Sequence, residues 1–234
     1  MQINSKMLPT QEFDGCDGGD PGSPTSPTIW IFGIEHGTYR SPATFESSQN
    51  HTDDGYTIQT QLTYPYNQKA FKLLAVINGL SIEDYRVFAE KTQPFVKGSK
   101  GYFKGNLYPY ACRSVSEWTP EAELETGMTK IEYKQWCNQH HIPAIKKWVD
   151  QYQPKVFIGV GNSNRTDFSQ AVFGNNVNFE THQFTVGTQT KKIFYAKVDG
   201  RRLVVIPHLS GGKNGLNSHE SVRVAGKFIA EFIQ

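Results

Sequence analysis

Two short apolar runs, each followed by a glycine, constrain the fold of this chain more than any other feature. Residues 29–32 read Ile-Trp-Ile-Phe and lead into Gly33, and residues 156–160 read Val-Phe-Ile-Gly-Val and lead into Gly161. Such runs without polar alternation are typical of strands covered on both faces, as in parallel sheets. An amphipathic helix expected at 132–151 precedes the second run. We therefore expect an α/β fold, a three-layer sandwich with a mostly parallel sheet of about four strands and helices on both faces.

Turn and capping signals predict the other elements. Helices are expected at 67–78, from Ser81 onward, from Asn217 or Ser218 to Ile233, and after a restart at Pro143 within 132–151. Strands are expected at 101–110, ending in a turn at Pro109, and at 194–198 and 203–206, joined by a hairpin turn at Asp199-Gly200. Residues 38–66 are polar and turn-rich, which indicates a long surface loop with a short hairpin at 55–63.

The length of 234 residues fits one large α/β domain. We expect residues 1–28, rich in Gly, Pro and Asp, to form an arm or loop, and residues 29–234 to form the domain. The formal net charge is +2, so any contact with nucleic acid must be local. No apolar run approaches the roughly 18 residues of a membrane helix, and residues 1–10 lack the apolar stretch of a secretory signal. These features favour a cytoplasmic monomer without membrane contact.

Metal and redox chemistry have little support in the sequence. Cys16, Cys112 and Cys137 are far apart and form no Cys-x-x-Cys pair, which speaks against a zinc ribbon or an iron–sulfur cluster. Adjacent residues on a helix point about 100° apart, so His140 and His141 would make a poor common metal site. We expect both histidines to be exposed to solvent, and no metal site.

Ionisable residues next to glycine follow two of the expected strands. The segment Gly33-Ile34-Glu35-His36-Gly37 follows the first strand, and His208 follows the strand at 203–206. Ligand sites of open α/β sheets form at the carboxyl ends of the strands, so a shared pocket is expected there. The loop at 207–217 offers glycines and Lys213 to a phosphate, but neither segment has the spacing G-x-x-x-x-G-K-[ST] or G-x-G-x-x-G. The common nucleotide motifs are therefore absent from these loops.

These segments resemble, in the same order, the motifs of the uracil-DNA glycosylase superfamily. The segment 33–37 has the place and length of the family loop G-Q-D-P-Y or G-M-N-P-G, and Gly105-Asn106-Leu107-Tyr108-Pro109 looks like the element T-N-x-x-x-C-P. Residues 154–161 resemble the family's P-K-V-I-x-x-x-G segment, and His208-Leu209-Ser210-Gly211 is similar to H-P-S-P or N-P-S-G. The resemblance covers roughly residues 28–234 and rests on the order and spacing of short motifs.

The resemblance implies a DNA glycosylase that flips a damaged pyrimidine, with uracil as the expected base, and hydrolyses its N-glycosidic bond without a metal or cofactor. The catalytic residues would be Glu35 and His208. Glu35, one methylene longer than the family's Asp, would orient or activate water. His208 would donate to the pyrimidine O2 as negative charge develops on the leaving base. Asn106 would pair with O4 and N3 of the base.

The remaining site residues are carried over from the same motifs. Together with Asn106, the base pocket would be lined by Gly33, Ile34, His36, Gly37 and Ser210. His36 replaces the usual proline, and Gly37 stands where one branch has a tyrosine that blocks the thymine methyl. DNA contacts would come from Gly211, Gly212, Lys213, Asn214 and Leu216. Lys213 would hold a phosphate, and Leu216 or another residue of the 211–217 loop would wedge into the base stack.

Other interpretations of the same residues stay open. The fold could bind a nucleotide, a nucleic acid or a protein partner without catalysis, and an unrelated hydrolase could use Glu35 with His36. Without the motif pattern, Glu35 reads as a solvated loop carboxylate and Asn106 as a turn former. The aromatic run Tyr64-Pro65-Tyr66 could stack on a base, although packing against the core is favoured.

Overall fold

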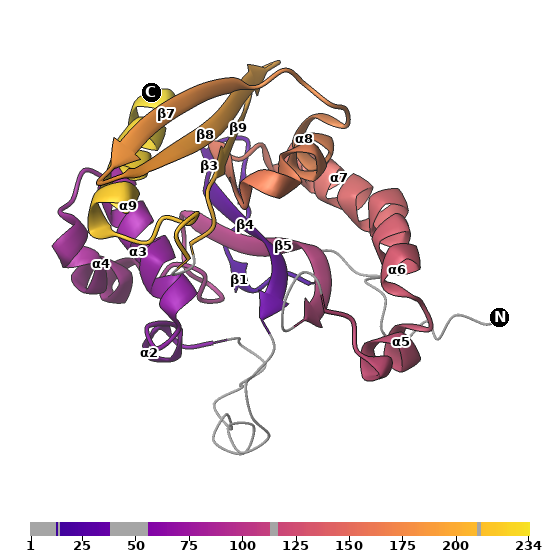
Figure 1. Cartoon of the computed structure of the whole chain (residues 1–234). Coiled ribbons are helices and arrows are strands. Elements are labelled where there is room, and N and C mark those ends of the chain that lie inside the picture. Colours follow the sequence, from indigo (N-terminus) through magenta and orange to yellow (C-terminus); the bar gives the residue numbers. More distant parts are fainter. Residues whose placement is uncertain (1–12, 14, 38–55, 113–116, 210–211) are drawn as a thin grey trace.

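A seven-stranded mixed sheet with helices on both faces organises the chain (Figure 1). This computed structural model describes residues 13, 15–37, 56–112, 117–209 and 212–234, with the backbone alone described at positions 36, 37 and 112. A separate two-stranded ribbon pairs β2 (Gly22–Ser23) with β3 (Ser26–Pro27). The predicted α/β class, with helices on both faces of the sheet, is confirmed.

Four parallel strands form the centre of the sheet. They are β4 (Ile29–Gly37), β5 (Tyr102–Cys112), β6 (Val156–Val160) and β9 (Arg201–Ile206), and they lie in the order β5-β4-β6-β9. Trp30 of β4 pairs in register with Phe103 on one side and Phe157 on the other. Both apolar runs of the sequence are therefore interior strands, as predicted.

The predicted number of strands is wrong, because three antiparallel strands extend the sheet at its edges. β1 (Gly18–Gly19) pairs with β5, while β8 (Gln189–Val198) pairs with β9 and with β7 (Glu180–Val186). β7 alternates exposed and half-buried residues and has few apolar side chains, and β1 consists of two glycines. Neither carries a strand pattern of its own. The hairpin predicted at Asp199-Gly200 joins β8 to β9 and is confirmed.

Several of the helices begin at a capping residue or a proline. They are α2 (Ile58–Gln61), α3 (Pro65–Ile77), η2 (Ile82–Asp84), α4 (Tyr85–Thr92), α5 (Pro120–Thr126), α6 (Lys130–Trp136), the π-helix η3 (Cys137–His141), α7 (Ile142–Tyr152), η4 (Asn162–Asn164), α8 (Arg165–Phe173) and α9 (His219–Phe232). Pro65 opens α3, and Ser218 caps α9 through a capping box with Ser221. No helix in the described part of the chain combines the length and apolar character needed to cross a membrane.

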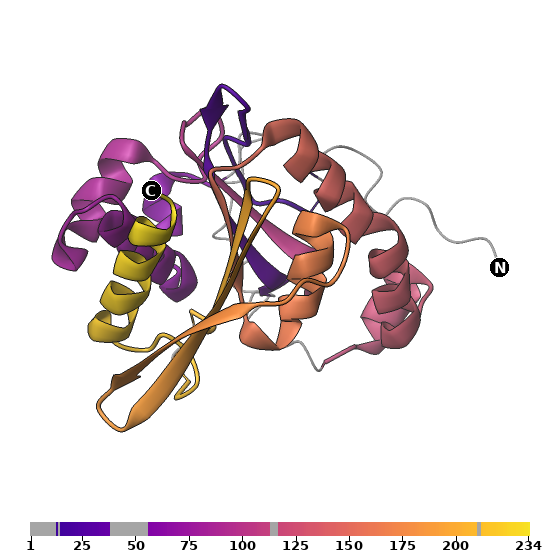
Figure 2. The same cartoon turned by 90° about the horizontal axis from the view of Figure 1, so that it is seen from above.

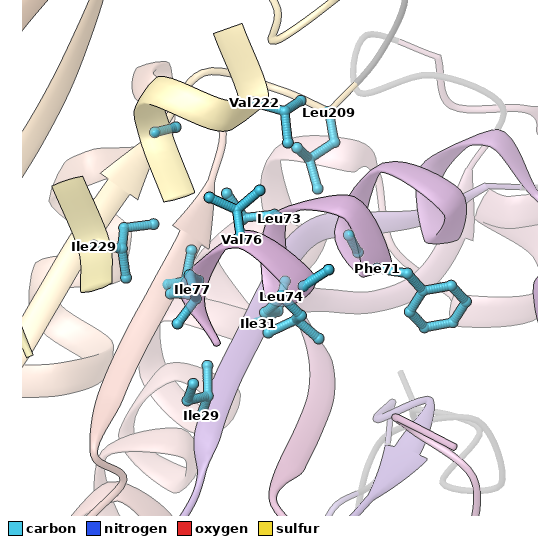
Figure 3. Close-up of a cluster of buried hydrophobic side chains, with 14 of the residues drawn as sticks. Ile29, Ile31, Phe71, Leu73, Leu74, Val76, Ile77, Leu209, Val222 and Ile229 are labelled. Carbon is cyan, nitrogen blue, oxygen red and sulfur yellow. The ribbon is translucent and has the colours of Figure 1, made fainter. Parts of the chain in front are cut away.

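Alternate residues of the central strands point to opposite faces and divide the core in two. Ile29 and Ile31 of β4 pack with α3, α4 and α9, whereas Trp30 and Phe32 pack with α6, α7 and α8. Figure 2 shows the two sets of helices on opposite sides of the sheet. In Figure 3 the apolar side chains of α3 and α9 meet above β4. The two faces are called below the α3 face and the α6 face.

Two local predictions are wrong. The hairpin expected at 55–63 is replaced over its described residues by α2, which Thr57 caps by accepting a hydrogen bond from the Thr60 N–H. The turn expected at Pro109 does not form, and β5 continues to Cys112. β1 pairs with β5 only at Phe103 and Lys104, so no strand needs an N–H from Pro109 on that edge.

Residues 17–20 lie along the outer edge of β5. The backbone N–H of Asp17 donates to the oxygen of Lys104 (3.0 Å), and that of Asp20 donates to Tyr102 (2.8 Å). The Trp30 indole N–H reaches back to the oxygen of Pro21 (3.0 Å). This segment therefore belongs to the sheet and covers what would otherwise be an open edge.

Candidate functional site

The strand order makes the carboxyl ends of β4 and β6 a topological switch point. The connection that leaves β4 carries α2, α3 and α4 over the α3 face, and the connection that leaves β6 carries η4 and α8 over the α6 face. Where such connections leave in opposite directions, open α/β sheets bind their ligands. Gly33 and Gly161 end the apolar parts of these two strands, and His208 follows β9 at the same edge.

Two polar side chains meet above Gly33 on the α3 face. Asn106 of β5 pairs in register with Gly33 and is 4% exposed. A Cβ built on Gly33 would lie 2.6 Å from Asn106 Oδ1 and 3.5 Å from the hydroxyl oxygen of Tyr66. Glycine is required at this position because the Asn106 amide oxygen occupies the space of a side chain.

Asp17 holds the Asn106 amide in one orientation. The Asn106 Nδ2 donates to Asp17 Oδ2 (3.1 Å), which leaves Oδ1 on the Gly33 side. Lys104 pairs with the same carboxylate (3.4 Å) and donates to Asn67 Oδ1 (3.0 Å). A fixed amide presents a defined hydrogen-bond acceptor rather than either of its two ends.

The Tyr66 hydroxyl is a buried donor without a hydrogen-bond partner among the described residues. Burial, together with the Asp17 charge, raises the pKa of Tyr66 well above its ordinary value, so the phenol keeps its proton at neutral pH. Its ring packs at the edge of the α3-face core, and Lys104 Nζ lies 5.2 Å from the ring centroid. The Tyr66 ring thus packs against the core, as favoured from the sequence, while its hydroxyl group points toward Gly33.

His208 joins this cluster from the end of β9. Its ring centroid lies 6.0 Å from that of Tyr66. Desolvation, with a further contribution from the Lys69 charge, lowers the pKa of His208 below its ordinary value. The structure therefore brings three predicted residues, Gly33, Asn106 and His208, together around Tyr66. We call Gly33, Asn106, Tyr66, Asp17 and His208 the Gly33 cluster.

Glu35 points away from this cluster. Its side chain is 5% exposed and lies 3.9 Å from Lys130 Nζ, at the start of α6. Burial of the Cys137 thiol, with a smaller contribution from the Glu35 charge, raises the pKa of that thiol to about 12. Because Lys130 begins α6 and Cys137 begins η3, these two interactions place the Glu35 carboxylate toward α6 and η3. The interpretation of Glu35 as a solvated loop carboxylate is wrong.

The loop after β9 differs from its predicted role in one respect. Leu216 is fully buried in the α3-face core, and its N–H donates to the oxygen of His208 (2.8 Å). It is therefore not placed to wedge into a base stack, and that prediction is corrected. Gly212, Lys213 and Asn214 are exposed, as a DNA contact requires. Ser210 and Gly211 lie outside the described residues.

The three other predicted residues beside Glu35 are Ile34, His36 and Gly37. Ile34 is 7% exposed and packs in the α6-face core. Its Cδ1 would lie 2.6 Å from a Cβ at Gly161, which explains the glycine there. The backbone of His36 and Gly37 belongs to β4, but their further details lie outside the described residues.

The prediction that both adjacent histidines are exposed is wrong for His141. This side chain is 2% exposed, and its Nε2 lies 3.3 Å from the backbone oxygen of Asn106. His140 is exposed as predicted. His141, Ile145 and Trp148 recur at helical spacing and form one inward stripe, which is the signal that could have identified the buried histidine.

Asp17 and Lys104 are site residues that the sequence analysis missed. Lys104 lies two positions before Asn106 on one strand, so strand alternation could have placed both on one face. Asp17 had no such signal, because its contact with Asn106 spans 89 positions. Within the described ranges, no three His, Cys, Asp or Glu side chains gather to hold a metal ion. Comparison with models of known protein families and with curated proteins finds no match for this chain.

Proposed function

We propose that this protein is a DNA glycosylase that hydrolyses the N-glycosidic bond of a flipped pyrimidine, with uracil as the expected base. The observation that carries the proposal is the Gly33 cluster, in which Asn106, Tyr66 and His208 converge at the carboxyl ends of parallel strands. A fold of the uracil-DNA glycosylase type belongs to the same proposal. The proposal also includes that the protein acts on DNA in the cytoplasm as a monomer, as expected from the sequence.

The polarity of the cluster matches the edge of uracil. Asn106 Oδ1 accepts, because Asp17 binds the Nδ2 end of the amide. Tyr66 donates, because its phenol is protonated. Uracil offers the complementary pair, a donor at N3 and an acceptor at O4, whereas cytosine offers an acceptor at N3 and a donor at N4. The pair would therefore favour uracil over cytosine.

His208 is suited to stabilise the leaving base. Its lowered pKa keeps the imidazole neutral at pH 7, with one ring nitrogen carrying a proton. A neutral imidazole can donate to the pyrimidine O2, where negative charge grows as the glycosidic bond breaks. Its place beside Tyr66 puts this donor next to the groups that would hold the base.

Glu35 remains the proposed carboxylate for the attacking water. Its side chain lies on the opposite side of the β4 end from Asn106, so base recognition and water activation would come from two sides of one strand end. Asp17 is the carboxylate within the Gly33 cluster and has a different task, since it holds Asn106. The two carboxylates can be tested separately.

The test is single-turnover excision from a uracil-containing oligonucleotide, with abasic sites revealed by alkali. We expect Glu35→Gln to lower the rate about 10²-fold or more while binding of uracil DNA persists. The matched control is Glu123→Gln, an exposed carboxylate of α5. A Glu35→Gln rate equal to that of the control would remove Glu35 from the chemistry.

Asn106→Asp tests recognition in the same assay. The new carboxylate would lie beside Asp17, and two adjacent carboxyl groups cannot both ionise easily, so one retains a proton. Unlike the amide, a carboxyl group can turn either of its oxygens toward Gly33, so the fixed acceptor at position 106 is lost and we expect the preference for uracil over cytosine to fall. Wild-type selectivity in this variant would place Asn106 outside the base pocket.

A second function, base binding without hydrolysis, is favoured by one observation. Glu35, the only carboxylate predicted to be catalytic, is turned toward Lys130 and away from the Gly33 cluster. A protein with this function would bind uracil-containing DNA and leave no abasic sites. The test is an excision assay on oligonucleotides that contain uracil, hypoxanthine or xanthine. An inactive protein leaves no abasic sites in any of them, whereas a glycosylase for another base leaves them in the oligonucleotide that contains that base.

A further inference from the structure

A cleft of about 410 Å³ lies between the start of α8 and the β8 strand, outside the Gly33 cluster. Its lining includes Arg165 of α8, Lys191 and Lys192 of β8, and Pro207 and Asn214 from the loop after β9. No carboxylate is among the residues that line it. The lining therefore carries positive charge and no negative charge.

Lys191 is the least expected of these cations, because its side chain is buried and only 3% exposed. Its Nζ donates to the backbone oxygen of Lys213, next to Asn214. Among the described residues this Nζ forms no ion pair with a carboxylate, and the backbone oxygen of Lys213 is its one hydrogen-bond partner. A buried ammonium without an opposite charge destabilises the fold, and a bound anion would remove this cost.

Arg165 adds a second cation that is held in place. Its guanidinium carbon lies 5.1 Å from the centre of the Phe194 ring, and Nη1 donates to the backbone oxygen of Asn162 (3.4 Å). Asn162 in turn donates to the oxygen of Lys192 (2.9 Å), which ties the start of α8 to β8. Stacking on an aromatic ring leaves the other guanidinium N–H groups available to an oxyanion.

The acidic residue of α8 does not neutralise this cleft. Asp167 accepts hydrogen bonds from Tyr108 (2.9 Å) and Asn164 (3.1 Å) and is absent from the lining. Two cations from different elements, one buried and one stacked, thus face a cleft without a counter-charge.

We propose that this cleft binds a phosphate group. Lysine and arginine with a backbone-anchored geometry are the usual donors to phosphate oxygens. Pro207 lines the cleft, and the next residue, His208, belongs to the Gly33 cluster. A phosphate of the nucleic-acid strand whose base enters that cluster is the source we infer, and this choice of source rests on the proposed function. A free nucleotide has the same chemistry.

The test measures binding and not excision. A fluorescent single-stranded oligothymidylate without uracil is titrated by anisotropy across a salt series, and unlabelled dTMP and pyrophosphate are added as competitors. The variants are Lys191→Met and Arg165→Gln. The matched control is Lys197→Gln, an exposed lysine of the same strand that does not line the cleft. Arg165 is exposed, so its variant keeps the test valid if Lys191→Met does not fold.

We expect each cleft variant to lower oligonucleotide affinity by about tenfold and to reduce the slope of log affinity against log salt by about one, with Lys197→Gln unchanged. If the variants weaken only dTMP and pyrophosphate, the phosphate site stands and a free nucleotide is its ligand. If they equal the control for all three probes, the inference is overturned. These outcomes do not depend on excision, so an inactive protein would contradict the proposed function alone.

Discussion

Gly33 supports the polar cluster because a side chain there would displace Asn106. In Gly33→Ala the new Cβ would lie 2.6 Å from Asn106 Oδ1, closer than van der Waals contact permits. We expect a loss of about 1–3 kcal/mol in the free energy of unfolding, measured with urea, from overpacking of a buried site. Weaker binding of uracil DNA should accompany it.

A double variant isolates the cause. Gly33→Ala combined with Asn106→Ala removes the clashing amide, so the cost of the alanine at position 33 should be smaller in that background. An equal cost in both backgrounds would mean that Asn106 does not explain the glycine.

His208 gives the site a pH dependence of known sign. Desolvation and then the Lys69 charge lower its pKa in the fold, so the unfolded chain binds the proton more tightly. Its contribution to stability is complete above the unfolded pKa of about 6.5 and is lost as the pH falls through the lower folded value. An NMR titration should therefore place the His208 pKa below the ordinary histidine value of about 6.5.

Lys69→Met should move the His208 pKa upward, because a positive neighbour is removed. Lys91→Met, an exposed lysine at the end of α4, serves as the control and should leave it unchanged. If the His208 pKa does not change in Lys69→Met, desolvation alone causes its lowered value.

At the scale of elements, Gly226 sets how closely α9 packs on α3. A Cβ there would lie 2.7 Å from Val76 Cβ and 3.3 Å from the backbone oxygen of Leu73. Alanine is favoured over glycine in a helix by about 1 kcal/mol, but overpacking costs about 1–3 kcal/mol. We expect Gly226→Ala to lower the free energy of unfolding by about 1 kcal/mol, and to do so less in a Val76→Ala background. A stabilising Gly226→Ala would show that the two helices can separate without cost.

Three elements that were predicted correctly have local signals. The capping box at Ser218, the proline at position 143 and the turn at Asp199-Gly200 each involve residues within a few positions of one another. Their energies act before any tertiary contact forms. β7 was not predicted. It is a strand because it pairs with β8, which in turn pairs with β9.

At the scale of the whole molecule, Phe13, which precedes the first strand of the sheet, packs against the α6-face core. The ring centroid of Phe13 lies 4.9 Å from that of Phe103, 5.0 Å from Trp148 and 5.3 Å from Tyr152. Phe13 is half-buried, so we expect Phe13→Ala to cost about 1–3 kcal/mol, less than a fully buried phenylalanine. Fluorescence and far-UV circular dichroism should report one coincident transition in urea.

The control for Phe13→Ala is Leu124→Ala, since Leu124 is 83% exposed. That variant should change the free energy of unfolding by less than about 0.5 kcal/mol. Equal effects of the two substitutions, or separate transitions by the two probes, would show that the segment is not part of the cooperative unit.

The sequence by itself determined the central architecture of this protein. The apolar runs at 29–32 and 156–160 predicted interior parallel strands, and helical periodicity predicted α3 and α9, because burial and backbone preference act on neighbouring residues. The carboxyl ends of the strands predicted at 29–32 and 203–206 indicated that Gly33 and His208 would lie at the same edge of the sheet.

Only the tertiary structure decided which side chains face one another at that edge. The register of β4 and β5 shifts between Glu35 and Gly37, and Glu35 lies toward α6 instead of Asn106. Asp17 reaches Asn106 because β1 pairs with β5, and Leu216 is buried because α9 packs over its loop. Such contacts join residues far apart in the chain, and their free energy depends on packing of the whole domain, which no local pattern encodes.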